Sequence, residues 1–288
     1  MRISNFLILI LLAALWGASF LFMRIAAPEF GPLPLVALRM SVAGLSLSFV
    51  FLQKEARQSL KQHWFALLIS GLFGSSLAFL LLSYASLTLS AGFTSLMNSS
   101  VPLFSAAIAA IWLKERLRIP QFIGLGFCII GTIILVWGKL DFSANGQGWP
   151  ITACMAACAC YGFGASWMKC KLSDVRPLVA SAGSLIGAAL VLIPFAFTQL
   201  PTTVPSLTSW ASVLALGFFC TALAFIFFFR LIQRTSATVA TSVTFLIPFF
   251  AIFWGWLFLN EEITSQMILG LSITLIGTSL ITGVFGRK

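Results

Sequence analysis

Residues 98–115 of the chain read NSSVPLFSAAIAAIWLKE, and residues 244–261 read TFLIPFFAIFWGWLFLNE. Each stretch has a proline in its fifth position and a glutamate in its last, with mostly apolar residues between them. The two stretches lie 146 positions apart. An apolar helix of about 20 residues spans the hydrocarbon core of a bilayer. The pair therefore indicates a membrane protein whose sequence contains the same unit twice.

The composition of the whole chain supports a membrane protein. The chain has 288 residues, of which 60% are hydrophobic and 8% are charged, whereas soluble domains carry roughly 25% charged residues. Too few charges are available to cover a water-exposed surface, so lipid must solvate most of the outside. The net charge of +10 comes from basic residues at the ends of apolar segments. This placement predicts control of membrane topology and excludes a nucleic-acid partner.

Hydropathy predicts an all-α membrane protein with ten transmembrane helices. The basic residues predict its orientation, because cytoplasmic loops carry an excess of Lys and Arg. Fourteen of the 17 basic residues fall on the side of the N-terminus, against Arg24 and Lys139 on the other side. We therefore expect both termini in the cytoplasm and the protein in a bacterial inner (plasma) membrane. The expected spans are 6–26, 33–52, 64–86, 91–113, 119–137, 148–168, 177–199, 209–230, 236–259 and 266–285.

The repeat divides the chain into two five-helix units, residues 6–137 and 149–284. An odd number of spans reverses the orientation of the second unit, so the repeats are inverted about an axis in the membrane plane. Inverted repeats recur in secondary transporters, where they supply conformations open to opposite sides. The pairs that match at a shift of 145 or 146 positions include Trp16 with Tyr161, Arg24 with Lys169, Gly71 with Gly217, Pro102 with Pro248, and Glu115 with Glu261.

Several short motifs accompany the repeat. The first span contains Leu15-Trp16-Gly17-Ala18-Ser19-Phe20, and the second contains Ala37-Leu38-Arg39. The fourth and ninth spans end in LKERL and LNEEI, and each of these motifs is followed by two regularly spaced glycines. In order and duplication these elements resemble the EamA family of the drug/metabolite transporter superfamily. The resemblance implies a ten-helix fold, a central cavity between the repeats and alternating access. Known members export amino acids and other metabolites.

Polar residues around the two repeated prolines are candidates for lining a substrate cavity. A proline inside a helix frees the carbonyl four residues earlier, here those of Asn98 and Thr244. Freed carbonyls and polar side chains near the midplane can line a cavity, although Ser and Thr side chains also bond to neighbouring helices. The candidates are Thr94, Asn98, Pro102, Thr241, Thr244 and Pro248.

Three further side chains within the spans are candidates for substrate contacts. Arg39 is an intramembrane cation, which is expensive to bury and is often functional. It could attract a substrate carboxylate, or it could snorkel outward or pair with Glu29 or a helix C-terminus. Trp16 and Tyr161 occupy equivalent positions in the two repeats and could stack on a substrate.

Glu115 and Glu261 are candidates for gating or for helix capping. Each lies at the end of a span and precedes the N-terminus of the next helix, where a carboxylate is favoured. Capping of the turn is the prediction, with gating as the alternative.

The chain lacks the residues of several other functions. No Asp, Glu or His lies in the middle of a predicted span, which argues against an intramembrane enzyme or an obligatory proton relay. Cys154, Cys158 and Cys160 cluster, but the single histidine, His63, is far away in a predicted polar loop. We expect no metal ion and no cofactor, and without a phosphate-binding loop ATP is not expected to drive transport.

The sequence therefore predicts a secondary transporter of a small metabolite, such as an exported amino acid, that works by alternating access. A lipid-carrier flippase of the same architecture is the alternative, followed by a non-transporting membrane scaffold. The expected partners are a small-molecule substrate and the lipid bilayer. The oligomeric state stays open, and a monomer is compatible with the sequence.

Overall fold

The computed structural model describes residues 3–115, 117–144, 146–235, 239–240 and 242–282, and within these ranges all regular structure is helical. Nine helical segments of the described chain are long and apolar enough to cross a membrane, and the shorter Val243–Leu259 is a tenth apolar helix. The predicted all-α membrane fold is confirmed. The α-helices are α1 (Ile3–Phe30), α2 (Pro32–Leu47), α3 (Lys54–Gly71), α4 (Leu77–Ala85), α5 (Ala91–Asn98), α6 (Val101–Trp112), α7 (Ile119–Val136), α8 (Gly148–Lys171), α9 (Pro177–Ala196), α10 (Leu207–Gly217), α11 (Ala224–Arg234), α13 (Val243–Leu259) and α14 (Ser265–Thr282).

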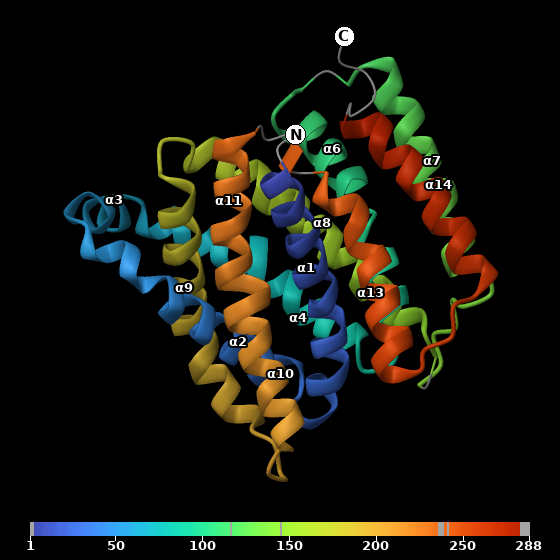
Figure 1. Cartoon of the computed structure of the whole chain (residues 1–288), viewed down its shortest axis with the longest axis horizontal. Coiled ribbons are helices and arrows are strands. Elements are labelled where there is room, and N and C mark those ends of the chain that lie inside the picture. Colours follow the sequence, from blue (N-terminus) through green and yellow to red (C-terminus); the bar gives the residue numbers. More distant parts are fainter. Residues whose placement is uncertain (1–2, 116, 145, 236–238, 241, 283–288) are drawn as a thin grey trace.

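The helices cross the molecule in alternating directions (Figure 1). We call the end where α1 begins the proximal end and the opposite end the distal end. The turn between α4 and α5 and the turn between α13 and α14 both lie at the distal end. The α6–α7 and α8–α9 connections lie at the proximal end. Connections this short make sequential helices antiparallel neighbours.

The backbone repeats the duplication that the sequence predicts. The segment from α3 to α4 contains a π-helix, η2 (Leu72–Ser76), and the segment from α10 to α11 contains another, η4 (Phe218–Leu223), 146 positions later. Likewise α7 and α14 start 146 positions apart and both have 18 residues. The same irregularity at the same place in both halves identifies two copies of one five-helix unit.

The turns that end the fourth and ninth predicted spans also match. Lys114 (φ 54°) and Asn260 (φ 52°) are the non-glycine residues with positive φ in the described chain, and they occupy equivalent positions. The following residues, Glu115 and Glu261, each donate their backbone N–H to the carbonyl six residues earlier, at 3.3 and 3.2 Å. Both glutamates therefore start from the same backbone geometry.

Two predictions about the spans are corrected. Pro102 does not lie inside a helix: α5 ends at Asn98, a turn follows, and Pro102 stands in the first turn of α6, where a missing N–H leaves no hydrogen bond unmade. Pro248 does lie inside α13. The helix that contains the third predicted span begins at Lys54 rather than at residue 64, because the polar stretch before the span is also helical.

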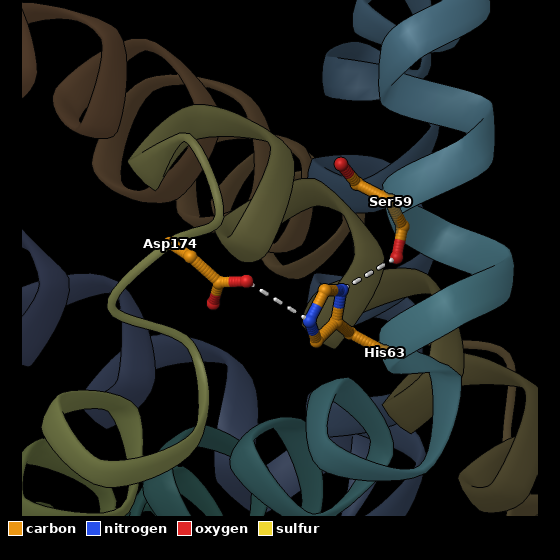
Figure 2. A network of polar contacts seen from close by, with 3 residues as sticks. All are labelled: Ser59, His63 and Asp174. Carbon is orange, nitrogen blue, oxygen red and sulfur yellow. Dashed lines mark hydrogen bonds and ion pairs between the residues drawn. The ribbon is translucent and has the colours of Figure 1, made fainter.

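His63 marks the point where this polar stretch meets the apolar part of α3. Its backbone is non-helical (φ −112°, ψ 16°), which kinks the helix. Figure 2 shows the ring between Ser59 and Asp174. Nδ1 donates to the Ser59 carbonyl at 3.2 Å, and Nε2 lies 3.3 Å from Asp174 Oδ2. The contact ties the first repeat to the α8–α9 loop of the second at the proximal end.

Helices α7 and α14 pack side by side along one flank of the molecule (Figure 1). Glycines make this close approach possible: a Cβ on Gly124 would lie 2.6 Å from the Gly277 carbonyl oxygen, and one on Gly131 would lie 2.3 Å from Thr274 Oγ1. Small residues allow helix backbones to approach in a membrane. The glycine spacing seen in the sequence therefore serves this pair.

Candidate functional site

A cavity of about 470 Å³ lies between the two repeats at mid-depth of the helices. Seven of the predicted cavity residues line it, namely Trp16, Arg39, Asn98, Pro102, Tyr161, Thr244 and Pro248. Thr94 does not: its side chain is fully buried, and its hydroxyl donates to the Ser90 carbonyl at 2.9 Å. Thr241 lies outside the described residues.

Arg39 places a buried cation on one wall of the cavity. The residue is only 3% exposed, and its Nε donates to Thr221 Oγ1 at 3.0 Å. The guanidinium carbon lies 3.6 Å from the centroid of the Phe79 ring. Among the described residues, no carboxylate lies within ion-pair distance of Arg39. A cation–π contact and a hydroxyl compensate only part of the cost of burying this charge.

Glu29, which the sequence offered as a partner for Arg39, is engaged elsewhere. Its carboxylate accepts from the backbone N–H of Ser206 at 2.5 Å and from the Ser206 hydroxyl at 2.9 Å. This contact joins the end of α1 to the start of α10. Arg39 is therefore left facing the cavity without this acid.

The π-helix η4 explains how Thr221 can serve Arg39. In this wider turn the Thr221 hydroxyl donates to the Leu216 carbonyl, five residues earlier, at 2.8 Å. The hydroxyl oxygen still has lone pairs with which to accept from Arg39. The sequence analysis missed Thr221 and Phe79 as site residues. The signal was the repeated Leu-Ala-Phe at 77–79 and 223–225, which was noted only as evidence of duplication.

Hydrogen-bond acceptors from α5 lie on another part of the cavity lining. Ser95 and Asn98 both line the cavity, and within the described part of the chain neither Ser95 Oγ nor Asn98 Oδ1 has a hydrogen-bond partner. Both oxygens are themselves buried. The cavity wall therefore combines a cation from α2 with two residues of α5 whose side-chain oxygens are unpaired.

Six aromatic residues also line the cavity, namely Trp16, Phe20, Phe79, Tyr161, Phe225 and Phe228. Trp16 packs against Phe228, with ring centroids 5.3 Å apart, and Tyr161 packs against Phe79 at 6.1 Å. Trp16 and Tyr161 belong to the equivalent helices α1 and α8, so each repeat contributes one large ring. A bound molecule would meet apolar faces here beside the charged and polar groups.

The two predicted gating or capping glutamates lie at opposite ends of the molecule, away from this cavity. The Glu261 carboxylate accepts from the backbone N–H of Ala91 at 2.7 Å and of Gly92 at 3.2 Å. It therefore caps α5, whereas the sequence placed it beside the N-terminus of the following helix, α14. In the described chain Glu115 forms an ion pair with Lys169.

The described residues contain no group of three or more His, Cys, Asp or Glu side chains placed to hold a metal ion. Cys154 and Cys158 are fully buried, and Cys160 is half-buried. Cys154 belongs to the apolar core and Cys160 packs against it, while Cys158 Sγ donates to the Met97 carbonyl at 3.5 Å.

A helical membrane fold in which two repeats enclose a mostly apolar cavity with a few polar groups at mid-depth is the architecture of a membrane solute transporter. The model of the EamA-like transporter family matches residues 4–137 and 148–283. The chain belongs to this family, and it is an integral membrane protein.

Relatives of this chain carry transporter names. It is 24% identical to the uncharacterized transporter YoaV of Bacillus subtilis, over 95% of each chain. It is 27% identical to a probable amino-acid metabolite efflux pump of Escherichia coli, over 97% of this chain and 94% of that one. It is 23% identical to a probable terminal-alkyne amino-acid exporter of Streptantibioticus cattleyicolor, over 97% and 94% of the two chains. A crystal structure with 19% identity shares the fold, with a TM-score of 0.66 over 97% of this chain and 96% of its own.

Proposed function

We propose that the protein is a secondary transporter that exports a small zwitterionic metabolite, an amino acid or a close derivative, by alternating access to the central cavity. The observation that carries the proposal is Arg39, a buried cation without an acidic partner in the described chain that faces the cavity. A substrate carboxylate would form an ion pair with this charge, because guanidinium and carboxylate groups form two strong parallel hydrogen bonds.

The ammonium group of a zwitterionic substrate would lie near two residues of α5. Ser95 and Asn98 line the cavity, and their buried, unpaired side-chain oxygens would accept from an ammonium group once the side chains turn toward it. The cavity volume of about 470 Å³ falls within the range of small-molecule sites. The names of two relatives, an amino-acid metabolite efflux pump and an amino-acid exporter, agree with this substrate class.

The proposal includes a membrane orientation. Both termini lie in the cytoplasm of a bacterium, and the two units 6–137 and 149–284 exchange conformations across the inner membrane. The excess of basic residues on the side of the N-terminus supports this orientation. The proximal end is then the cytoplasmic end, and the distal end faces outside.

The test is counterflow in proteoliposomes with a panel of amino acids, with and without a pH gradient. The best substrate is then compared with two analogues, the amine that lacks its carboxylate and the acid that lacks its amine. We expect flux for the zwitterion and at least about a tenfold loss for each analogue, the equivalent of one charge-assisted hydrogen bond. Absence of flux for every amino acid, or equal flux for the amine, would contradict the proposal.

The matched variants are Arg39→Lys and Arg57→Lys. Both preserve the charge, but only Arg39 faces the cavity, whereas Arg57 is exposed at the start of α3. Lysine cannot reproduce the planar fork of arginine. Selective loss of transport in Arg39→Lys would support a carboxylate bound by the guanidinium, and normal transport would contradict it.

A further inference from the structure

The equivalent ends of the two repeats carry the same pair of charges. Arg24 on α1 and Glu261 after α13 lie at the distal end, and their equivalents in the repeat, Lys169 on α8 and Glu115 after α6, lie at the proximal end. Glu115 and Glu261 also share the same turn geometry, with a positive φ at the preceding residue. Symmetry alone would give the two pairs the same contacts.

The contacts are nevertheless different. At the proximal end, Lys169 and Glu115 bond to each other. At the distal end, Arg24 and Glu261 both bond to the turn between α4 and α5. Arg24 Nη1 donates to the carbonyls of Ser86 at 2.7 Å and Leu87 at 2.8 Å, while Glu261 accepts from the two amides described above. Arg24 and Glu261 thus hold the turn from both sides.

Glu261 accepts hydrogen bonds from backbone N–H groups at the start of α5 that have no partner within the helix. The first N–H groups of a helix lack partners within it. In α5, Ala91 and Gly92 donate to Glu261, and Phe93 donates to the hydroxyl of Ser90. The contact crosses from the second repeat to the first, so it persists only while the repeats are in this arrangement.

An open cavity, and not packed side chains, lies between Arg24 and Glu261, so the two side chains can approach each other. Both line one distal cavity of about 700 Å³. Lys139 and Glu262 also line this cavity, but the Lys139 ammonium lies over the Phe93 ring, 4.3 Å from its centroid. In the described chain Arg24 donates to backbone carbonyls and Glu261 accepts from backbone amides. The distal cavity leaves open space between the Arg24 and Glu261 side chains.

We propose that Arg24 and Glu261 form the distal gate of the transport cycle. In the conformation described here they clamp the α4–α5 turn and close the distal end. When the distal end opens, Glu261 releases Ala91 and Gly92 and pairs with Arg24, as Glu115 pairs with Lys169 in this structure. The proximal pair separates in the same step, because inverted repeats exchange their local arrangements between the two conformations. The gate rests on the proposed alternating-access function.

The experiment measures how fast a membrane-impermeant maleimide, added on the distal side, labels Ser95→Cys in a background without the six native cysteines. Ser95 lines the central cavity and is 1% exposed, so its labelling reports distal opening. The variants are Glu261→Arg, Arg24→Glu, the two combined, and Glu261→Gln. Lys139→Gln is the matched control, because it removes a charge from the same cavity.

In the combined variant, the arginine at position 261 cannot accept hydrogen bonds from the amides of Ala91 and Gly92, so the clamp is lost. The exchanged charges at positions 24 and 261 can still form an ion pair in the open conformation. We expect the combined variant to label about tenfold faster than either single charge reversal, since a charge-assisted bond has this magnitude. Glu261→Gln, which preserves volume and weakens the cap, is expected to label faster than the parent, and Lys139→Gln at the parent rate.

The gate proposal would be overturned if the two charge reversals had additive effects on the labelling rate. It would also be overturned if Glu261→Gln labelled at the parent rate. An increase in Lys139→Gln equal to that in Glu261→Gln would also count against it. The melting temperature in detergent checks that each variant is folded, and labelling from the proximal side should slow as distal labelling speeds up. Labelling does not require an identified substrate, so a failure of amino-acid counterflow with the expected labelling pattern would contradict the substrate proposal and leave the gate standing.

Discussion

Replacement of Gly255 by alanine tests the distal clamp through a residue that itself carries no charge. A Cβ built on Gly255 would lie 2.3 Å from Glu261 Oε2 and 3.0 Å from its Cδ. Because a carboxylate at the end of a flexible side chain moves more readily than backbone, Glu261 would turn away. It would then lose the hydrogen bonds from Ala91 at 2.7 Å and Gly92 at 3.2 Å.

The cost of this change follows from the two lost contacts. Loss of an N-terminal cap costs about 0.5–2 kcal/mol, and loss of a negative charge beside a helix N-terminus costs about 0.3–1 kcal/mol. These two costs overlap, because both belong to the same carboxylate at the same helix end. The net expectation is that the closed distal conformation loses about 1–2 kcal/mol. This corresponds to a shift of about fivefold to thirtyfold in the equilibrium between closed and open forms.

The assay is again distal labelling of Ser95→Cys, combined with the melting temperature in detergent. Gly126→Ala is the control, because nothing lies within 4 Å of a Cβ at that position. We expect faster labelling in Gly255→Ala and the parent rate in Gly126→Ala. If Gly255→Ala labels at the parent rate, Glu261 does not hold the distal end closed in the way its hydrogen bonds suggest.

Three further predictions concern the cavity and the helix pairs. In counterflow with the preferred amino acid, Arg39→Lys should raise KM about tenfold to a hundredfold, because lysine cannot form the two parallel hydrogen bonds of arginine. An unchanged KM would rule out a substrate carboxylate at Arg39. Asn98→Ala should lower transport with normal membrane insertion, since Asn98 Oδ1 is an unsatisfied acceptor in the cavity wall; equal transport would remove Asn98 from the site. Gly131→Ala should destabilise the protein by about 1–3 kcal/mol through overpacking, because its Cβ would lie 2.3 Å from Thr274 Oγ1 and 2.9 Å from Thr274 N; an unchanged melting temperature would contradict the close α7–α14 contact.

The spans and the repeat could be predicted because both depend on local composition. Apolar length identifies a membrane helix without knowledge of its neighbours, and duplicated Pro, Glu and Gly residues align the two halves. The break between α5 and α6 was missed. Ser99 and Ser100 lie inside an otherwise apolar window, so hydropathy gives one continuous span, and Pro102 was taken as a residue inside a helix when it stands in the first turn of α6.

The site could be predicted only in part, because its partners come from distant segments. Arg39 and Asn98 were identified from their polarity within spans. Thr221, which accepts from Arg39 across 182 positions, depends on tertiary packing that no periodicity reveals. Thr94 was placed in the cavity because it shares a helical face with Asn98, but Ser95, its neighbour in the chain, has the cavity-facing position.

The same limit applies to Glu261. Its position at a span end and its preference for a helix N-terminus followed from the sequence. The helix it caps did not, because α5 precedes Glu261 by 169 to 170 positions and belongs to the other repeat. Sequence proximity pointed to α14, whereas the fold brings α5 closer.

The two π-helices carry information about the history of the chain. A π-turn contains one residue more than an α-turn and so marks a single-residue insertion in a helix. Two separate insertions, each retained at the same place in its half, would require a coincidence. One insertion before duplication accounts for η2 and η4 together. A bulge older than the duplication would imply a five-helix ancestor that paired with a second, inverted copy of itself in the same membrane.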